Sequence, residues 1–238
     1  VTPDSHAPIS HLLVTTKAYD VREAVASVVH LLCEDSLVVL MVNGLGLAEE
    51  LCEDWPHLNL FFGTTTEGAY AIAPQHIQHT GRGETRIGRQ GQNEPPLWFD
   101  PWSSAMNPSL WDNNIEAALW SKMAINCIIN PLTALHHCTN GELGQRRELI
   151  EHVATLCNEL SQITRAAGFE TIATVLSQRV ADVIARTARN RSSMLQDVES
   201  GRRTEIDYIT GFLLRIADRY SIDAPHNRAL LKSIKKNE

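Results

Sequence analysis

Three polar side chains at intervals of four residues stand out in the apolar stretch Leu119–Asn140. They are Lys122, Asn126 and Asn130, an amine followed by two carboxamides. On a helix, residues four apart lie on one face, about 40° from one another. The residues between them are almost all apolar, so the sequence predicts a buried helix with one narrow polar stripe. Hydrogen-bonding groups in such a place need partners, which either the protein or a ligand supplies.

The lysine of this stripe has a chemical use of its own. Burial lowers the pKa of a lysine, which can then donate a proton near neutral pH. The alternative is structural: Lys122 extends to water from the helix end, and the two asparagines cap neighbouring loops. The pattern alone leaves these interpretations evenly balanced. Pro131 follows the stripe and is expected to end or kink the helix, because its ring removes a backbone donor and restricts Asn130.

Polar residues also follow two runs that have the character of parallel strands. Lys17 comes after His11–Thr16, and Asn43 comes directly after the continuous apolar run Ser36–Val42. In open parallel sheets, ligands bind outside the carboxyl ends of the strands. Lys17 could therefore bind a pyrophosphate or a carboxylate, or it could be an ordinary solvated lysine.

Two glycines come directly after Asn43, in the segment Asn43-Gly44-Leu45-Gly46. Glycine lets a ligand approach the backbone closely, so the segment resembles half of a phosphate-binding loop. A plain tight turn explains the pair of glycines equally well.

A further polar cluster lies between two predicted helices, around Ser193 and Glu205. Ser193 could hold a carboxylate, and Glu205 could orient an amine or a ribose. Ordinary helix capping is the alternative, since Thr204 is a suitable N-cap for a helix predicted to run to Tyr220.

The elements that must position these groups alternate in the first half of the chain. Strand-like and helical patterns follow one another, as in a doubly wound α/β sheet. Strands are predicted over 11–16, 36–42 and 58–66, helices over 20–32 and 48–54, short antiparallel strands within 70–88, and a loop over 89–101.

From residue 113 onward the apolar spacing is helical throughout. Helices are predicted over 114–129, 146–167, 172–188 and 204–220, with a last one after Pro225. The predicted fold class is therefore α/β plus all-α, with a parallel-sheet domain over residues 1–112 and an all-helical domain over residues 113–238.

The composition of the 238 residues restricts the partners. A net charge of −7 argues against nucleic acid or an anionic membrane as the main partner. No run approaches the roughly 18 consecutive apolar residues of a membrane helix. The five cysteines lack CxxC spacing, and the histidines lack a metal-ligand pattern such as HExxH. Reduced thiols and no metal site are therefore expected.

Seven segments together closely resemble the ketopantoate reductase (2-dehydropantoate 2-reductase) family in their order and spacing. The match extends over almost the whole chain, and its central and C-terminal motifs are the specific ones. The segments are VTTKAY at 14–19, VNGLG at 42–46, GTTT at 63–66, LWSKMAINCIINPLTAL at 119–135, NGEL at 140–143, NRSSMLQD at 190–197 and TEIDYITGFLL at 204–214.

The resemblance implies an NADPH-dependent reduction of 2-dehydropantoate (ketopantoate) to (R)-pantoate, in the cytoplasmic synthesis of pantothenate and coenzyme A. It also implies a Rossmann-type NADP-binding domain, a C-terminal domain like that of 6-phosphogluconate dehydrogenase, and a homodimer. Lys122 matches the general acid that protonates the carbonyl oxygen as hydride arrives, and Glu205 matches a second catalytic position. The implied substrate-binding residues are Asn126, Asn130, Asn140, Ser193 and Lys17, and the implied cofactor-side residues are Lys17, Asn43, Ala69 and Glu205.

One departure from the family lies at the front of the chain. A full member begins with a strand and a G-x-G-x-x-G turn that places a pyrophosphate at a helix N-terminus, and no such motif occurs here. The Rossmann-type sheet is therefore expected to be truncated, without its first βαβ segment. Two other functions stay open: a shortened homologue that binds a small acid or acts as an interaction module, and a reductase of a related 2-oxoacid.

Overall fold

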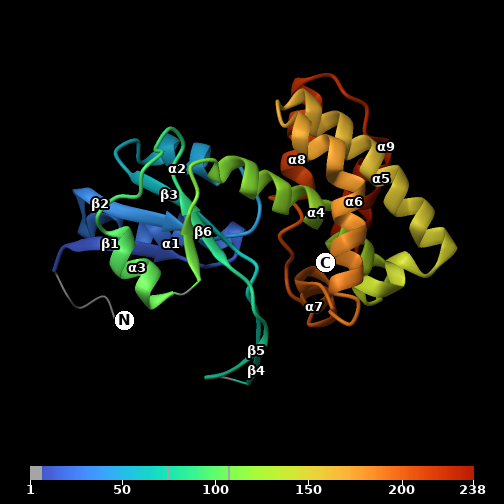
Figure 1. Cartoon of the computed structure of the whole chain (residues 1–238), viewed down its shortest axis with the longest axis horizontal. Coiled ribbons are helices and arrows are strands. Elements are labelled where there is room, and N and C mark those ends of the chain that lie inside the picture. Colours follow the sequence, from blue (N-terminus) through green and yellow to red (C-terminus); the bar gives the residue numbers. More distant parts are fainter. Residues whose placement is uncertain (1–6, 74, 107) are drawn as a thin grey trace. The chain divides into compact units, whose positions relative to one another are not determined.

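The computed structural model describes residues 7–73, 75–106 and 108–238, which form two compact units (Figure 1). The first unit comprises the chain up to Asn43 and Leu47–Leu119. The second comprises Trp120–Glu238 together with the short segment Gly44–Gly46. Helix α4, Ile115–His136, begins in the first unit and ends in the second.

The first unit is built on a five-stranded sheet in the order β1-β2-β3-β6-β7. Its first three strands are parallel, β6 is antiparallel to β3, and β7 is parallel to β6. This sheet confirms the predicted α/β class for the first part of the chain. The strands are β1 Ile9–Val14, β2 Leu32–Leu40, β3 Asn59–Thr65, β6 Thr85–Gly88 and β7 Ser109–Trp111.

The apolar run of β2 is covered on both faces of the sheet. Val38, Val39 and Leu40 are consecutive, and none of them is more than 4% exposed. Successive residues of a strand point to opposite faces, so this burial requires a layer on each side. Helices α1 (Val21–Val28) and α2 (Leu47–Asp54) alternate with the parallel strands, as predicted.

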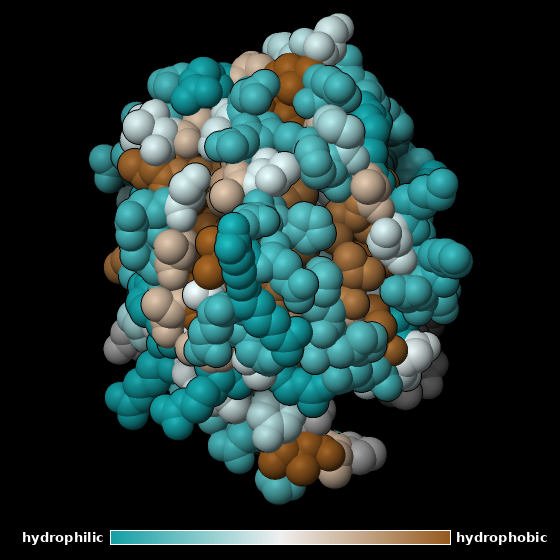
Figure 2. Space-filling view, turned by 90° about the vertical axis from the view of Figure 1, so that its right-hand side faces the viewer, coloured by the Kyte–Doolittle hydropathy of each residue, from teal (hydrophilic) through white to brown (hydrophobic). Residues whose placement is uncertain are grey.

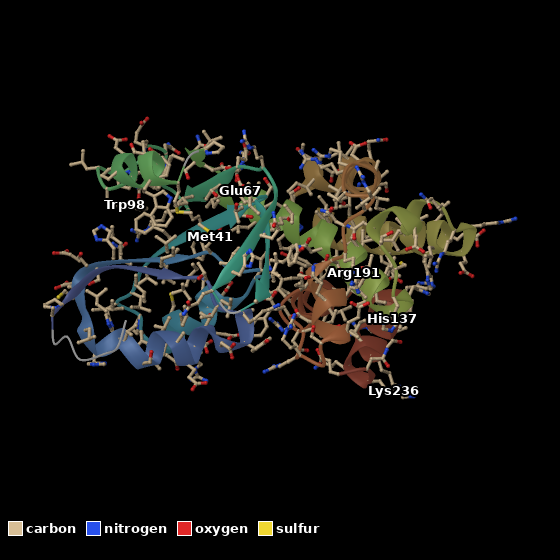
Figure 3. The ribbon with its side chains drawn as sticks, turned by 90° about the horizontal axis from the view of Figure 1, so that it is seen from below. Met41, Glu67, Trp98, His137, Arg191 and Lys236 are labelled. Atoms are coloured by element: carbon tan, nitrogen blue, oxygen red, sulfur yellow. The ribbon has the colours of Figure 1, made fainter. Side chains whose placement is uncertain are left out.

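Two short elements near the end of the first unit were not predictable from composition. Helix α3 (Phe99–Ala105) begins inside the segment predicted to be a loop, and β7 follows it. An aromatic cluster holds both: Phe61 of β3 packs edge-on against Trp98 with ring centroids 5.0 Å apart, and Trp111 packs against Phe99 at 5.5 Å. Figure 3 labels Trp98. Long-range packing, rather than local propensity, orders this part of the chain.

A separate hairpin of the first unit consists of β4 (Gly68–Ala73) and β5 (His76–Gly81). The two strands are antiparallel, which confirms the predicted antiparallel strands in this region. Its large apolar side chains Tyr70, Ile72 and Ile77 are exposed.

The second unit is helical, as predicted. After α4 come the turn Asn140–Gly144 and five helices, and Figure 1 shows them from yellow-green to red. The helices are α5 Arg147–Ala166, α6 Glu170–Arg186, α7 Ser193–Glu199, α8 Thr210–Arg219 and α9 Pro225–Lys236.

Pro131 was expected to end or kink the helix, and the structure contradicts the first of these alternatives, because α4 continues to His136. Proline in a helix interior removes one hydrogen bond and costs about 3 kcal/mol. Here Ile128, Leu132 and Ala134 on either side of the proline are at most 1% exposed. Continuing the helix buries this apolar surface, which outweighs the cost of the proline.

The helix predicted to start at Thr204 starts six residues later, at Thr210. The Thr204 hydroxyl accepts a bond from the Ile206 N–H at 3.2 Å, and both the N–H and the hydroxyl of Thr204 donate to Glu238. Turns at Tyr208 and Ile209, whose N–H groups donate to the Glu205 carbonyl, fill the intervening segment. Thr204 therefore stabilises a turn and not the first turn of α8.

The surface of the helical unit is largely polar on the face shown in Figure 2, where apolar side chains form narrow bands between hydrophilic ones. None of the helices within the described residues combines the length and the apolar character that crossing a membrane requires.

Candidate functional site

The predicted polar stripe lies on α4 of the second unit. Lys122 and Asn126 are partly buried, and Asn130 is 8% exposed. Met123, Cys127 and Ile128, which fill the other faces of the helix, are at most 2% exposed. The structure thus confirms a buried helix that carries one amine and two carboxamides on one face.

A buried carboxylate lies near the amine of this stripe. Burial lowers the pKa of Lys122, and the nearby Glu205 carboxylate acts in the opposite direction without cancelling the effect of burial. Glu205 is only 4% exposed, in the turns that precede α8. This environment favours a lysine that acts inside the protein over one that extends into solvent. An ammonium with a lowered pKa is a better proton donor than an exposed lysine.

Two hydroxyl groups connect the far end of the stripe to α7. The Thr133 and Ser192 hydroxyls are hydrogen bonded at 2.7 Å, and both residues are buried. Ser192 is the N-cap of α7, because its Oγ accepts the Leu195 N–H at 3.0 Å. The sequence had pointed to Ser193, which is the exposed first residue of α7.

Asn140 is held by its own chain at the start of the turn after α4. Its Nδ2 donates to the Thr187 hydroxyl at 2.8 Å, and its N–H donates to the Asn190 carbonyl at 3.0 Å. The Asn140 Oδ1 is buried and accepts no hydrogen bond from a described residue. One acceptor of this predicted substrate residue thus remains unused within the part of the chain that the structure describes.

Lys17 and Asn43 belong to the first unit, where they follow β1 and β2. These strands are parallel neighbours, and the Met41 N–H donates to the Val14 carbonyl at 2.9 Å just before the two polar residues. The structure therefore brings Lys17 and Asn43 to one edge of the sheet, as the strand-end argument predicts. Both side chains are partly buried, whereas Ala69 is exposed in β4.

The glycines after Asn43 have a structural explanation. Gly44 and Gly46 have φ values of +87° and +96°, which side chains disfavour. A Cβ on Gly44 would lie 2.5 Å from the Tyr208 carbonyl oxygen, and the Leu45 N–H donates to that same oxygen at 3.0 Å. The close approach that these glycines permit is an approach of the chain to itself, which favours the tight-turn interpretation.

Among the described residues, no three His, Cys, Asp or Glu side chains lie close enough together to hold a metal ion. His136 and His152 have ring centroids 6.1 Å apart. Burial and the neighbouring His152 lower the pKa of His136.

The polar groups of the second unit suit the protonation of a carbonyl oxygen. Lys122 can supply a proton, Glu205 supports its positive charge, and the carboxamides of Asn126 and Asn130 can orient hydroxyl and carboxylate groups. Thr133 and Ser192 were missed by sequence reasoning. The Ser-Ser pair before an apolar helix start could have indicated the cap, but no sequence signal links it to Thr133.

Comparison with protein families gives two matches that together cover most of the chain. Residues 1–92 match the family described as ketopantoate reductase PanE/ApbA, and residues 114–238 match the one described as ketopantoate reductase PanE/ApbA C terminal.

Individual proteins are similar to this chain over most of its length. The 2-dehydropantoate 2-reductase of Escherichia coli O157:H7 is 40% identical over 238 residues, which is 99% of this chain and 77% of that protein. The crystal structure of a probable 2-dehydropantoate 2-reductase from Bacillus subtilis is 29% identical with a TM-score of 0.76, covering 96% of this chain and 77% of that one. The ternary structure of D-mandelate dehydrogenase with NADH and anilino(oxo)acetate shares the fold, with a TM-score of 0.87 at 22% identity over 98% of this chain and 78% of that one.

Proposed function

The chain belongs to the ketopantoate reductase family, and we propose that it catalyses the reduction of ketopantoate to pantoate with NADPH as the hydride donor. Dinucleotide-dependent reduction follows from the family, and the choice of NADPH over NADH is part of the proposal. One observation carries the proposal. The partly buried Lys122, on the helix that contains the family's motif, lies near the buried carboxylate of Glu205. We assign cofactor binding to residues 1–112 and substrate binding to residues 113–238.

Lys122 is the proposed general acid. As hydride adds to the carbonyl carbon, the electrons of the C=O π bond move to oxygen, and negative charge develops there. The Lys122 ammonium stabilises this charge and transfers a proton to the oxygen, which completes the hydroxyl group. Glu205 is the second catalytic residue of the proposal, because its carboxylate opposes the lowering of the Lys122 pKa by burial and so favours the protonated amine.

The remaining polar groups of the second unit bind and orient the substrate in this proposal. Asn126 and Asn130 present carboxamides on the same face of α4 as the acid, and Asn140 has an unused buried acceptor. Ser193, at the N-terminus of α7, would bind the carboxylate of the substrate. Several donors and acceptors of this kind match a small acid with carbonyl, carboxylate and hydroxyl groups better than an apolar ligand.

The polar edge of the first unit suits a dinucleotide. Lys17 offers a cation and Asn43 a carboxamide at the carboxyl edge of the parallel strands, which is the edge where such ligands bind. We propose that these two residues hold NADPH together with Ala69 and Glu205, and that Lys17 also reaches the substrate. The bound nucleotide supplies the hydride.

The test is NADPH oxidation with ketopantoate. It compares this chain, the same chain preceded by a G-x-G-x-x-G strand–turn–helix of the family, and the Lys122→Ala variant of each. We expect turnover in the chain with the glycine-rich segment and a loss of roughly 10²–10⁴-fold in kcat in its Lys122→Ala variant. Lys232→Ala, on the exposed face of α9 in the same unit, is the matched control and should retain activity.

Two results would contradict the proposal. Full activity in the Lys122→Ala variant would show that Lys122 is not the general acid. Equal kcat/KM values with NADH and NADPH would show that the enzyme does not prefer NADPH. The family further leads us to propose a cytoplasmic homodimer, which sedimentation and cell fractionation would test.

A further inference from the structure

A buried hydrogen-bonded link joins the helix of the catalytic lysine to the cap of α7. Thr133 Oγ1 lies 2.7 Å from Ser192 Oγ, 2.8 Å from the Ile129 carbonyl and 3.0 Å from the Asn130 carbonyl. Thr133 is fully buried and Ser192 is 7% exposed. Water therefore has little access to either hydroxyl, and each must find its partners inside the protein.

The partners settle the direction of this link. Each hydroxyl has one hydrogen, and the two helix carbonyls can only accept. If Thr133 donated to Ser192, its oxygen lone pairs would face both carbonyls. The hydrogen of Ser192 would then have no acceptor among the described residues. The arrangement that satisfies every group runs from the Leu195 N–H to Ser192 Oγ, from the Ser192 hydroxyl to Thr133 Oγ1, and from the Thr133 hydroxyl to the α4 carbonyls.

The two ends of this chain of bonds lie next to two residues that the proposed function places at the substrate. One end is the backbone carbonyl of Asn130, which belongs to the polar stripe. The other end is the cap of α7, whose next residue is Ser193. A change in the link would therefore alter the spacing between the Asn130 carboxamide and the Ser193 hydroxyl.

We propose that Thr133 and Ser192 are positioning residues that fix Asn130 and Ser193 at the spacing that binds the substrate. They do not touch the substrate, and they act by holding α7 against α4 beside Pro131. This inference rests on the proposed function, since it assigns substrate contacts to Asn130 and Ser193. It predicts that losing the link weakens substrate binding without affecting proton transfer from Lys122, which lies about three turns earlier on α4.

The experiment uses Thr133→Val, which keeps the shape of the side chain and removes its hydroxyl, and Thr133→Ser, which keeps the hydroxyl. Ser192→Ala and the double variant complete a mutant cycle. Thr155→Val is the matched control, because the Thr155 hydroxyl donates to the Glu151 carbonyl on the exposed face of α5. Each variant is made in the protein that shows turnover of ketopantoate in the test above. The measured quantities are KM, kcat, the thermal stability and the hydrogen-exchange rate of the Leu195 amide.

We expect Thr133→Val to raise KM for ketopantoate roughly three- to tenfold, as for one lost buried hydrogen bond. The KM for NADPH and the kcat should change less than twofold. The Leu195 amide should exchange faster in Thr133→Val, and Thr133→Ser should restore both properties. The KM for ketopantoate of the double variant should be no higher than that of the single variant with the higher KM, since both changes break the same link. Thr155→Val should leave all these values unchanged.

A purely structural role predicts a different pattern, in which thermal stability falls and KM for ketopantoate stays at its original value. That result, or a KM that rises equally for both substrates, would overturn the inference while leaving the proposed function intact. A protein that exchanges its Leu195 amide as described but never turns over ketopantoate would instead overturn the proposed function, and the inference with it.

Discussion

Glu159 of α5 carries a prediction about how the helical unit is held together. Its carboxylate is 7% exposed and meets the N-terminus of α9, where it accepts four hydrogen bonds. Oε1 accepts from the His226 N–H at 2.9 Å and lies 2.7 Å from His226 Nδ1. Oε2 accepts from the Asn227 N–H at 3.0 Å and from Asn227 Nδ2 at 2.7 Å. The negative charge also complements the positive end of the helix dipole.

The magnitude follows from which donors water can reach. Glu159→Gln keeps one acceptor oxygen for the fully buried Asn227 and exposes the His226 donors to water, so we expect about 2 kcal/mol of lost stability. Glu159→Ala also leaves both Asn227 donors unpaired, which raises the loss to about 4 kcal/mol. In a chain of this size 1 kcal/mol corresponds to about 2–4 °C in Tm, so the two variants should melt roughly 4–8 °C and 8–16 °C lower.

The pH dependence has a definite sign. Burial alone would raise the pKa of Glu159, but the bonds from His226 and Asn227 outweigh it, and the pKa lies below its ordinary value of 4.5. A carboxyl group with a lowered pKa stabilises the fold above its unfolded pKa, and this contribution disappears as the pH falls through the folded value. The Tm difference between the natural protein and Glu159→Gln should therefore be full at pH 7 and shrink below pH 4.5.

The assay is thermal unfolding followed by circular dichroism between pH 7 and pH 3. Glu151→Gln, an exposed carboxylate on the same helix, is the matched control and should change the stability by no more than about 0.5 kcal/mol. A Glu159→Gln variant as stable as the control, or a Tm difference that persists unchanged at pH 3, would refute the reasoning.

The remaining predictions concern the catalytic pair and the glycine turn. Burial lowers the pKa of Lys122 and the Glu205 carboxylate partly offsets this effect, so Glu205→Gln should move the alkaline fall of kcat to lower pH. Glu170→Gln, at an exposed position in the first turn of α6, should leave that fall in place, and the same pH profile in Glu205→Gln would show that Glu205 does not act on the lysine. Gly44→Ala should lower stability by more than the roughly 1–2 kcal/mol of a left-handed alanine, since its Cβ would also meet the Tyr208 carbonyl. Gly168→Ala, at φ +92° with open space around it, isolates the backbone effect, and equal losses in thermal denaturation would contradict the packing argument.

The periodic elements and the polar stripe were predictable because they depend on local patterns. The continuous apolar run of β2 and the spacing of Lys122, Asn126 and Asn130 identify their elements from the residues alone. The aromatic elements of the first unit were not, because α3 contains a proline and depends on the contact of Trp98 with Phe61, nearly forty residues away, and on the packing of Phe99 against Trp98. Local propensity carries no information about such partners.

The sequence by itself determined the fold class, the family and the chemical types of the candidate residues, since these follow from periodicity and motif order. Only the tertiary structure showed that Glu205 lies near Lys122, that α4 continues past Pro131, and that Thr133 is linked to Ser192. The physical reason is the same in each case. The lowered pKa of a buried amine, the tolerance of a helical proline and the pairing of two hydroxyls are all set by neighbours brought together by packing, and those neighbours are distant in the chain.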